Sequence, residues 1–203
     1  MSPAATLGTV LLAYLPAAVT PGPNFVLIAH TAATGTRRAA VAIALGVVAA
    51  GGLLAAVAVF GLGTVLARTP WLATALRVAC GGYLAWLGVR LWWRARAPVK
   101  PPEEKLGHGN AFGRGVLSNL TNPKAAAFFG SVLTATLPPT EPTAVKAAAV
   151  ALIVAASACW HLSVALLFSS PATQRWYARA EPALNRVVGT VLIALGIALA
   201  VMP

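Results

Sequence analysis

The stretch TNPKAAAFF, residues 121–129, places an asparagine, a proline and a lysine in consecutive positions inside an apolar run. Proline lacks a backbone N–H donor, and its ring clashes with the carbonyl one turn back, so a helix is expected to break here. A similar stretch, TPGPN at 20–24, interrupts the first apolar run of the chain. Two polar breaks in otherwise apolar helices are therefore the features on which the prediction of the fold depends.

The composition shows whether these breaks lie in water or in a membrane. The 203 residues are 59% hydrophobic and 9% charged, which is far more apolar than a typical soluble domain. Six apolar runs each approach or exceed the roughly twenty residues that a helix needs to cross a bilayer. We therefore predict an all-α integral membrane protein with six transmembrane helices, at about 4–33, 39–66, 71–93, 111–137, 143–169 and 183–202.

Only one connection between these runs is long. Residues 94–113 are rich in proline, glycine and charge, which is typical of a solvated linker. The first run lacks a basic leader and continues well past signal-peptide length, so a retained helix is expected. The sequence thus predicts a single transmembrane domain over 1–203, with one half at about 1–93 and the other at about 114–203.

The two halves resemble each other. GGYLAWLGVRL at 81–91 and GTVLIALGIAL at 189–199 match at five of eleven positions, and Pro23 and Pro123 occupy corresponding places. Two copies of a three-helix repeat must have opposite orientations in the membrane. Inverted repeats whose helices are interrupted at corresponding positions are typical of secondary transporters, and the interruptions indicate the binding site.

The distribution of basic residues predicts the orientation. Fifteen Lys and Arg against four acidic residues give a net charge of +11, which in a membrane protein favours anionic lipid rather than nucleic acid as the partner. Connections 1–2, 3–4 and 5–6 hold ten basic residues, whereas the opposite side holds Arg68, Arg77 and Lys146. By the positive-inside rule the ten lie in the cytoplasm, so both termini are expected outside.

The breaks themselves are the candidate binding site. Irregular backbone is tolerated at membrane depth only where it is buried in protein or lines a wet cavity, so both breaks should face inward. Their carbonyls can accept hydrogen bonds from an ammonium, and amides at a new helix start can donate to a carboxylate. The alternative is that the prolines merely kink their helices. The candidate substrate-binding residues are Thr20, Pro21, Gly22, Pro23, Asn24, Asn122, Pro123 and Lys124.

Few ionisable residues fall inside the predicted helices. The four acids, Glu103, Glu104, Glu141 and Glu181, all lie in connections. Lys124 has no acid of the helix cores to pair with, so its ammonium should either reach the interface or await the carboxylate of a substrate. Arg90 and His30 are expected near the cytoplasmic interface.

His161 lies midway through the fifth run and is the candidate for proton coupling, because imidazole can gain and lose a proton during a cycle. The alternative is a neutral histidine that is satisfied by one interhelical hydrogen bond.

Two other functions compete with the transport of a small molecule that carries an ammonium and a carboxylate. An exporter of metal or another small cation would need oxygen or sulfur ligands, and Cys80 and Cys159 lack metal-binding spacing. A small intramembrane enzyme would need a nucleophile with its base; Ser157 and His161 share a helical face, but no nucleophile turn accompanies them. We therefore predict that the protein is not an enzyme and uses no cofactor.

Five motifs follow one another along the chain: TPGPN at 20–24, GTRRAA at 35–40, GGYLAWLGVRL at 81–91, FGRGVLSNLTNPKAAAFF at 112–129 and LNRVVGTVLIALG at 184–196. In their order and spacing they resemble the LysE/RhtB family of bacterial amino-acid exporters. The resemblance implies six helices and export of amino acids or related metabolites across the bacterial cytoplasmic membrane by proton antiport. The family pattern has an aspartate after the glycine pair of the second helix, where this chain reads GVVAAGGLL at 46–54. Alternating access to the site at the breaks is then expected, in a monomer or a homo-oligomer.

Overall fold

A computed structural model describes residues 2–94, 110–138 and 140–201, and every element within these ranges is helical. Most of the predicted linker at 94–113 lies outside the described residues. In chain order the elements are α1 (Pro3–Val19), α2 (Pro23–Thr34), α3 (Arg37–Ala56), the π-helical segment η1 (Val57–Leu62), α4 (Gly63–Arg68), α5 (Pro70–Arg94), α6 (Ala111–Leu120), α7 (Pro123–Ala127), the π-helical segment η2 (Phe128–Val132), α8 (Leu133–Thr136), α9 (Thr143–Leu167) and α10 (Pro171–Val201).

Four helical segments are long and apolar enough to cross a membrane, and a bent pair, α1 with α2, adds a fifth. The prediction of an all-α membrane protein is confirmed at this level. The fourth predicted run, 111–137, is divided among α6, α7, η2 and α8, which are individually too short to qualify. The four unbroken segments are Arg37–Leu62, Pro70–Trp93, Thr143–Leu167 and Pro171–Val201.

The last helix begins earlier than the hydropathy indicates. α10 starts at Pro171 instead of near residue 183, and Pro182 lies inside it. Its polar first turns are held by packing rather than by apolar composition, because the Tyr177 ring contacts Phe25 of α2 and Phe168 after α9. Aromatic contacts of this kind depend on tertiary structure and leave no periodic signal along the sequence.

Both predicted breaks are present. α1 ends at Val19 and α2 begins at Pro23, and the two helices are bent by 53° relative to each other. α6 ends at Leu120 and α7 begins at Pro123. In each case proline occupies the first turn of the new helix, where its missing N–H costs no intrahelical hydrogen bond.

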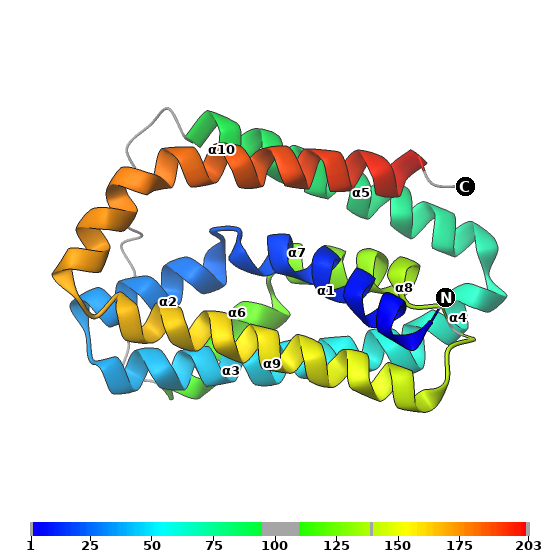
Figure 1. Cartoon of the computed structure of the whole chain (residues 1–203), viewed down its shortest axis with the longest axis horizontal. Helices are drawn as coiled ribbons and strands as arrows, with labels where there is room; N and C mark the ends of the chain where they lie inside the picture. Colours follow the sequence, from blue (N-terminus) through cyan, green and yellow to red (C-terminus); the bar gives the residue numbers. More distant parts are fainter. Residues whose placement is uncertain (1, 95–109, 139, 202–203) are drawn as a thin grey trace.

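The remaining helices are assembled in two groups (Figure 1). α3 packs closely on α6 and α9, and backbones of α3 and α6 touch at Gly46 and Gly115, where any side chain would collide with the opposite helix. α5 and α10 lie side by side along one edge of the molecule. The start of α1 and the end of α10 lie at one end, and the α2–α3 and α9–α10 connections lie at the other.

Candidate functional site

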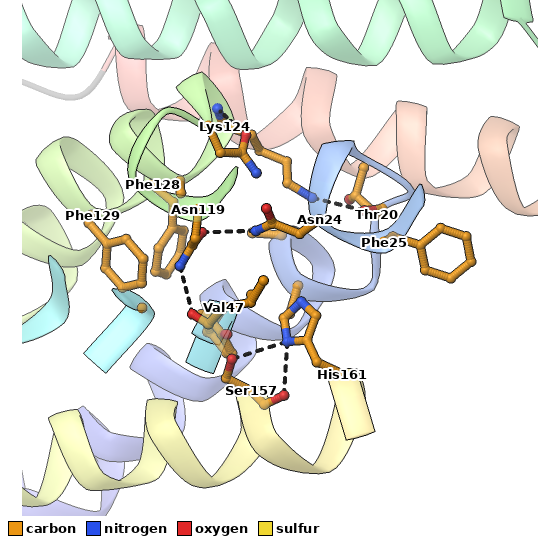
Figure 2. A pocket seen from close by; sticks show the side chains of 16 residues that line it. Thr20, Asn24, Phe25, Val47, Asn119, Lys124, Phe128, Phe129, Ser157 and His161 are labelled. Carbon is orange, nitrogen blue, oxygen red and sulfur yellow. Dashed lines mark hydrogen bonds between the residues drawn. The ribbon is translucent and has the colours of Figure 1, made fainter. Parts of the chain in front are cut away.

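The two breaks meet at Lys124. This lysine is the second residue of α7, and its Nζ donates a hydrogen bond to the backbone carbonyl oxygen of Thr20 at 2.8 Å (Figure 2). Thr20 is completely buried in the other break. A Cβ atom on Gly22 would lie 3.2 Å from Nζ, so glycine leaves the room that the lysine side chain occupies. One hydrogen bond therefore joins residues that are separated by 104 positions in the sequence.

The predicted site residues line two adjoining spaces. A cleft of about 1180 Å³ separates α2 and α6 from α5 and α10, and a smaller cavity of about 40 Å³ lies deeper in the protein. Asn122 and Lys124 border both spaces. Pro21, Gly22, Pro23 and Pro123 border only the cleft, whereas Thr20 and Asn24 border only the small cavity.

Asn24 belongs to a buried chain of amides that links three helices. Its Nδ2 donates to Asn119 Oδ1 at 2.9 Å, and its Oδ1 accepts a hydrogen bond of 2.8 Å from the hydroxyl of Ser118. Asn119 Nδ2 in turn donates to the carbonyl oxygen of Val47 at 2.9 Å (Figure 2). This chain holds α2, α6 and α3 together beside the small cavity. The side chain of Asn24 is thus already hydrogen-bonded within the protein.

The sequence interpretation omitted Ser118 and Asn119. The signal was nevertheless present, because an asparagine in an apolar helix within one turn of a break needs a polar partner. Which partners the Asn119 side chain contacts could not be deduced without the close packing of α6 on α3.

Asn122 has an unused donor. Its Oδ1 accepts a hydrogen bond of 3.0 Å from the backbone N–H of Lys124 and so caps α7. The side chain is 2% exposed, and its Nδ2 has no hydrogen-bond partner among the described residues. A buried N–H without an acceptor is costly, and such groups in native proteins call for an explanation. Because Asn122 borders both spaces, a bound ligand could supply the acceptor.

His161 lies on the opposite wall of the small cavity. It comes from α9, and its Nδ1 lies 2.9 Å from the carbonyl oxygen of Ser157 and 3.1 Å from the Ser157 hydroxyl. A carbonyl oxygen only accepts, so this contact assigns the proton to Nδ1. The second ring nitrogen points away from Ser157 toward the side where Asn24 lies (Figure 2). Lys124 and His161 therefore line one cavity.

The rest of the small cavity is mostly apolar. Tyr14 and Phe128 form an edge-to-face pair at 5.4 Å between ring centroids, and Phe129 packs on Phe128 in the same manner. The cavity can therefore combine a few polar contacts with an apolar wall, which is typical of small-molecule sites. Its lining is completed by Ala17, Ala18, Phe25, Val47, Gly51, Ala125 and Ser157.

Arg90 and His30, which are predicted near the interface, both border the cleft, as does Arg114. Arg90 is exposed, and its guanidinium carbon lies 4.7 Å from the centroid of the Trp86 ring. His30 lies near the end of α2, in the same cleft. Neither residue borders the small cavity.

Comparison with known sequences supports a transport protein. Residues 15–203 match the family described as LysE type translocator. The chain is 31% identical to a threonine efflux protein of Escherichia coli strain K12 over 195 residues, which cover 93% of this chain and 94% of that protein.

A homoserine/homoserine lactone efflux protein of Salmonella typhimurium is 29% identical over 125 residues, which cover 61% of each chain. No solved structure matches the chain.

Proposed function

Because this chain belongs to the family of LysE type translocators, we propose that it is a secondary active exporter of amino acids or related small metabolites. The family and its efflux relatives are transporters rather than enzymes, and the chain is a multi-pass protein of the bacterial inner membrane. The finer proposals below concern the binding site, the coupling ion and the transport cycle.

The hydrogen bond between Lys124 Nζ and Thr20 O is the observation that carries the proposal. It places the Nζ of a half-buried lysine where two broken helices meet, beside a cleft wide enough for a metabolite. An ionisable group at membrane depth is expensive and usually functional. We propose that the substrate carboxylate binds to Lys124 and Asn122, within a site formed by residues 20–24 and 122–124.

The transport cycle that we propose is alternating access. Six crossings arranged as two inverted repeats, about 1–93 and 114–203, would place the cytoplasmic linker 94–113 between them. The packing of α5 on α10 supports the repeat, because Gly81 approaches Gly196 just as Gly189 approaches Gly88. These are equivalent contacts if 81–91 corresponds to 189–199. The cleft opens between the end of α5 and the start of α10, which would be the cytoplasmic side.

For coupling, we propose proton antiport through His161. The imidazole faces the cavity that Lys124 also borders, so protonation of the ring and binding of substrate would influence each other electrostatically. The exposed apolar faces of α5 and α10, including Trp71 and Trp93, would contact lipid or a second copy of the chain.

Purified protein in liposomes would test the proposed function. Vesicles loaded with each common amino acid in turn should release at least one of them faster than protein-free vesicles, and an inwardly directed proton gradient should accelerate that release. Export of no amino acid would contradict the proposal. Release at the same rate with and without the proton gradient would contradict only the proton antiport.

A further inference from the structure

The site where the breaks meet has more donors to offer than acceptors. Lys124 is half-buried, and its Nζ donates one hydrogen bond, to Thr20 O. Asn122 Nδ2 is buried and unpartnered within the part of the chain that the structure describes. Both groups face the small cavity and the cleft. A ligand that supplies two acceptor oxygens would satisfy both.

Four acceptor oxygens around this point each already accept a hydrogen bond. Thr20 O accepts from Lys124 Nζ, and Asn122 Oδ1 accepts from the Lys124 backbone N–H. Asn24 Oδ1 accepts from Ser118, and Asn119 Oδ1 accepts from Asn24. A substrate ammonium would bring three more N–H donors to a place where each of these oxygens already accepts one.

The electrostatic balance points the same way. None of the residues that line the small cavity is acidic. Among the described residues that line the wider cleft, the acidic one is Glu181. It already interacts with another group of the protein and lies near Tyr177. When Lys124 is protonated, a zwitterion would leave its charge uncompensated and would place a second ammonium near it. A monoanion would neutralise the site, which matters most where water is scarce.

Resting on the proposed export function, we infer that the site recognises the carboxylate alone, and that monocarboxylic acids without an ammonium group are substrates at least as good as the corresponding amino acids. The class comprises deaminated acids and N-acylated amino acids of similar size. Lys124 and Asn122 each bind one carboxylate oxygen, while the apolar wall at Phe128 and Phe129 receives the carbon chain.

Matched substrates in proteoliposomes test this inference. For threonine the set is threonine itself, 3-hydroxybutanoate, which lacks the ammonium, and 1-aminopropan-2-ol, which lacks the carboxylate. Equivalent sets would be used for every other amino acid that the vesicles release. The deaminated acid should be exported at least as fast as the amino acid, and the amine should be neither exported nor inhibitory.

The variant Asn122→Asp sharpens the test. Aspartate keeps the oxygen that caps α7 but replaces the Nδ2 donor with a second, negatively charged oxygen. Export of the deaminated acid should then fall about tenfold or more, with a smaller loss for the amino acid, whose ammonium gains a partner. Arg68→Met, an exposed change at the end of α4, is the matched control and should alter neither substrate.

Three results would overturn the inference. Export of amino acids with no export of their deaminated acids would refute it while leaving the proposed function intact. Strong inhibition by the amine would also refute it, because recognition would then depend on the ammonium. If neither amino acids nor acids were exported, the proposed function and the inference would fail together.

Discussion

The Lys124 ammonium is held inside the protein by a backbone carbonyl instead of a carboxylate. Its partner, Thr20 O, is available because the first break ends α1 at Val19. An intact helix would have used that carbonyl in its own ladder. The break thus supplies the acceptor that a lysine without an acidic partner requires. A neutral carbonyl compensates only part of the charge, so the site remains ready for an anion.

Replacement of Lys124 by methionine should remove export without preventing membrane insertion. Methionine keeps most of the apolar stem and loses the charge. Loss of one charge-assisted hydrogen bond, about 1.5–3 kcal/mol, predicts a decrease of roughly 10- to 150-fold in transport efficiency. Export rates normalised to the amount of protein in the membrane would measure the effect, with Arg68→Met as the control. Export at the wild-type level would mean that Lys124 does not bind the substrate.

Replacement of His161 by glutamine should separate proton coupling from substrate binding. Glutamine can still accept and donate hydrogen bonds, but it does not titrate. We expect the acceleration of export by a proton gradient to disappear, while exchange of labelled for unlabelled substrate continues. Equal loss of both activities would instead indicate that the contact of His161 with Ser157 is structural.

At the scale of single residues, the sequence predicted which side chains cost free energy when they are buried in a membrane. Lys124 and His161 stand out because ionisable side chains in apolar helices are rare. The partners could not be predicted. Asn24 looked like a substrate ligand, and only the packing of α6 on α3 shows that its amide is engaged by Asn119 and Ser118.

Among the elements, the antiparallel pair of α5 and α10 is built on backbone contact. A Cβ atom on Gly88 would lie 2.5 Å from Gly189 O, and one on Gly81 would lie 2.6 Å from Gly196 O. The Trp92 indole N–H donates to the Thr190 hydroxyl at 3.1 Å across the same seam. Small residues allow this close approach in membranes, where apolar area alone gives little driving force between helices.

Two alanine substitutions in α5 should therefore have opposite effects on stability. Gly82 has no atom within 4 Å of its would-be Cβ, so Gly82→Ala should stabilise the helix by up to about 1 kcal/mol. Gly88→Ala should push α5 from α10 and destabilise the protein by about 1–3 kcal/mol. Thermal unfolding of the two variants in the same detergent would compare them. Equal shifts of the same sign would contradict the close packing of this seam.

The sequence predicted helix breaks better than helix ends. Proline next to glycine or asparagine interrupts a helix for local reasons that the sequence shows directly. Both breaks occur at the predicted places, in TPGPN and in TNP. The start of α10 follows instead from the contact of Tyr177 with Phe25, which lies 152 residues earlier in the chain. Long-range packing of this kind cannot be deduced from hydropathy.

For the whole molecule, the cleft divides the α5–α10 pair from the remaining helices. Each predicted repeat contributes one helix to this pair. A movement of the pair against the rest would open and close the cleft without breaking the glycine seam, because the tight contacts lie within the moving unit. Small interfaces between large packed units are where domain movements usually occur.

Orientation in the membrane decides whether this geometry suits export. The cleft is bordered by the second half of α5 and the first half of α10, which lie toward the end of the molecule that carries the α2–α3 and α9–α10 connections. Of the basic residues counted for this side, Arg37 and Arg38 begin α3, and Arg175 and Arg179 lie near the start of α10. The positive-inside rule predicts such residues on the cytoplasmic side. An exporter must load its substrate from that side. The positive-inside rule therefore predicts that the cleft opens to the cytoplasm and that both chain ends lie outside.

Single cysteines would test this orientation in intact cells. Cys80 and Cys159 would first be replaced by alanine, since both are free thiols and Cys159 is exposed. Ser2→Cys should then react with a membrane-impermeant thiol reagent, because Ser2 precedes α1 at the predicted outer end. Ser169→Cys, exposed between α9 and α10, should react only after the cells are permeabilised. The reverse pattern would place the cleft opening outside, where it would receive substrate for uptake, and would therefore argue against export as well as against the predicted topology.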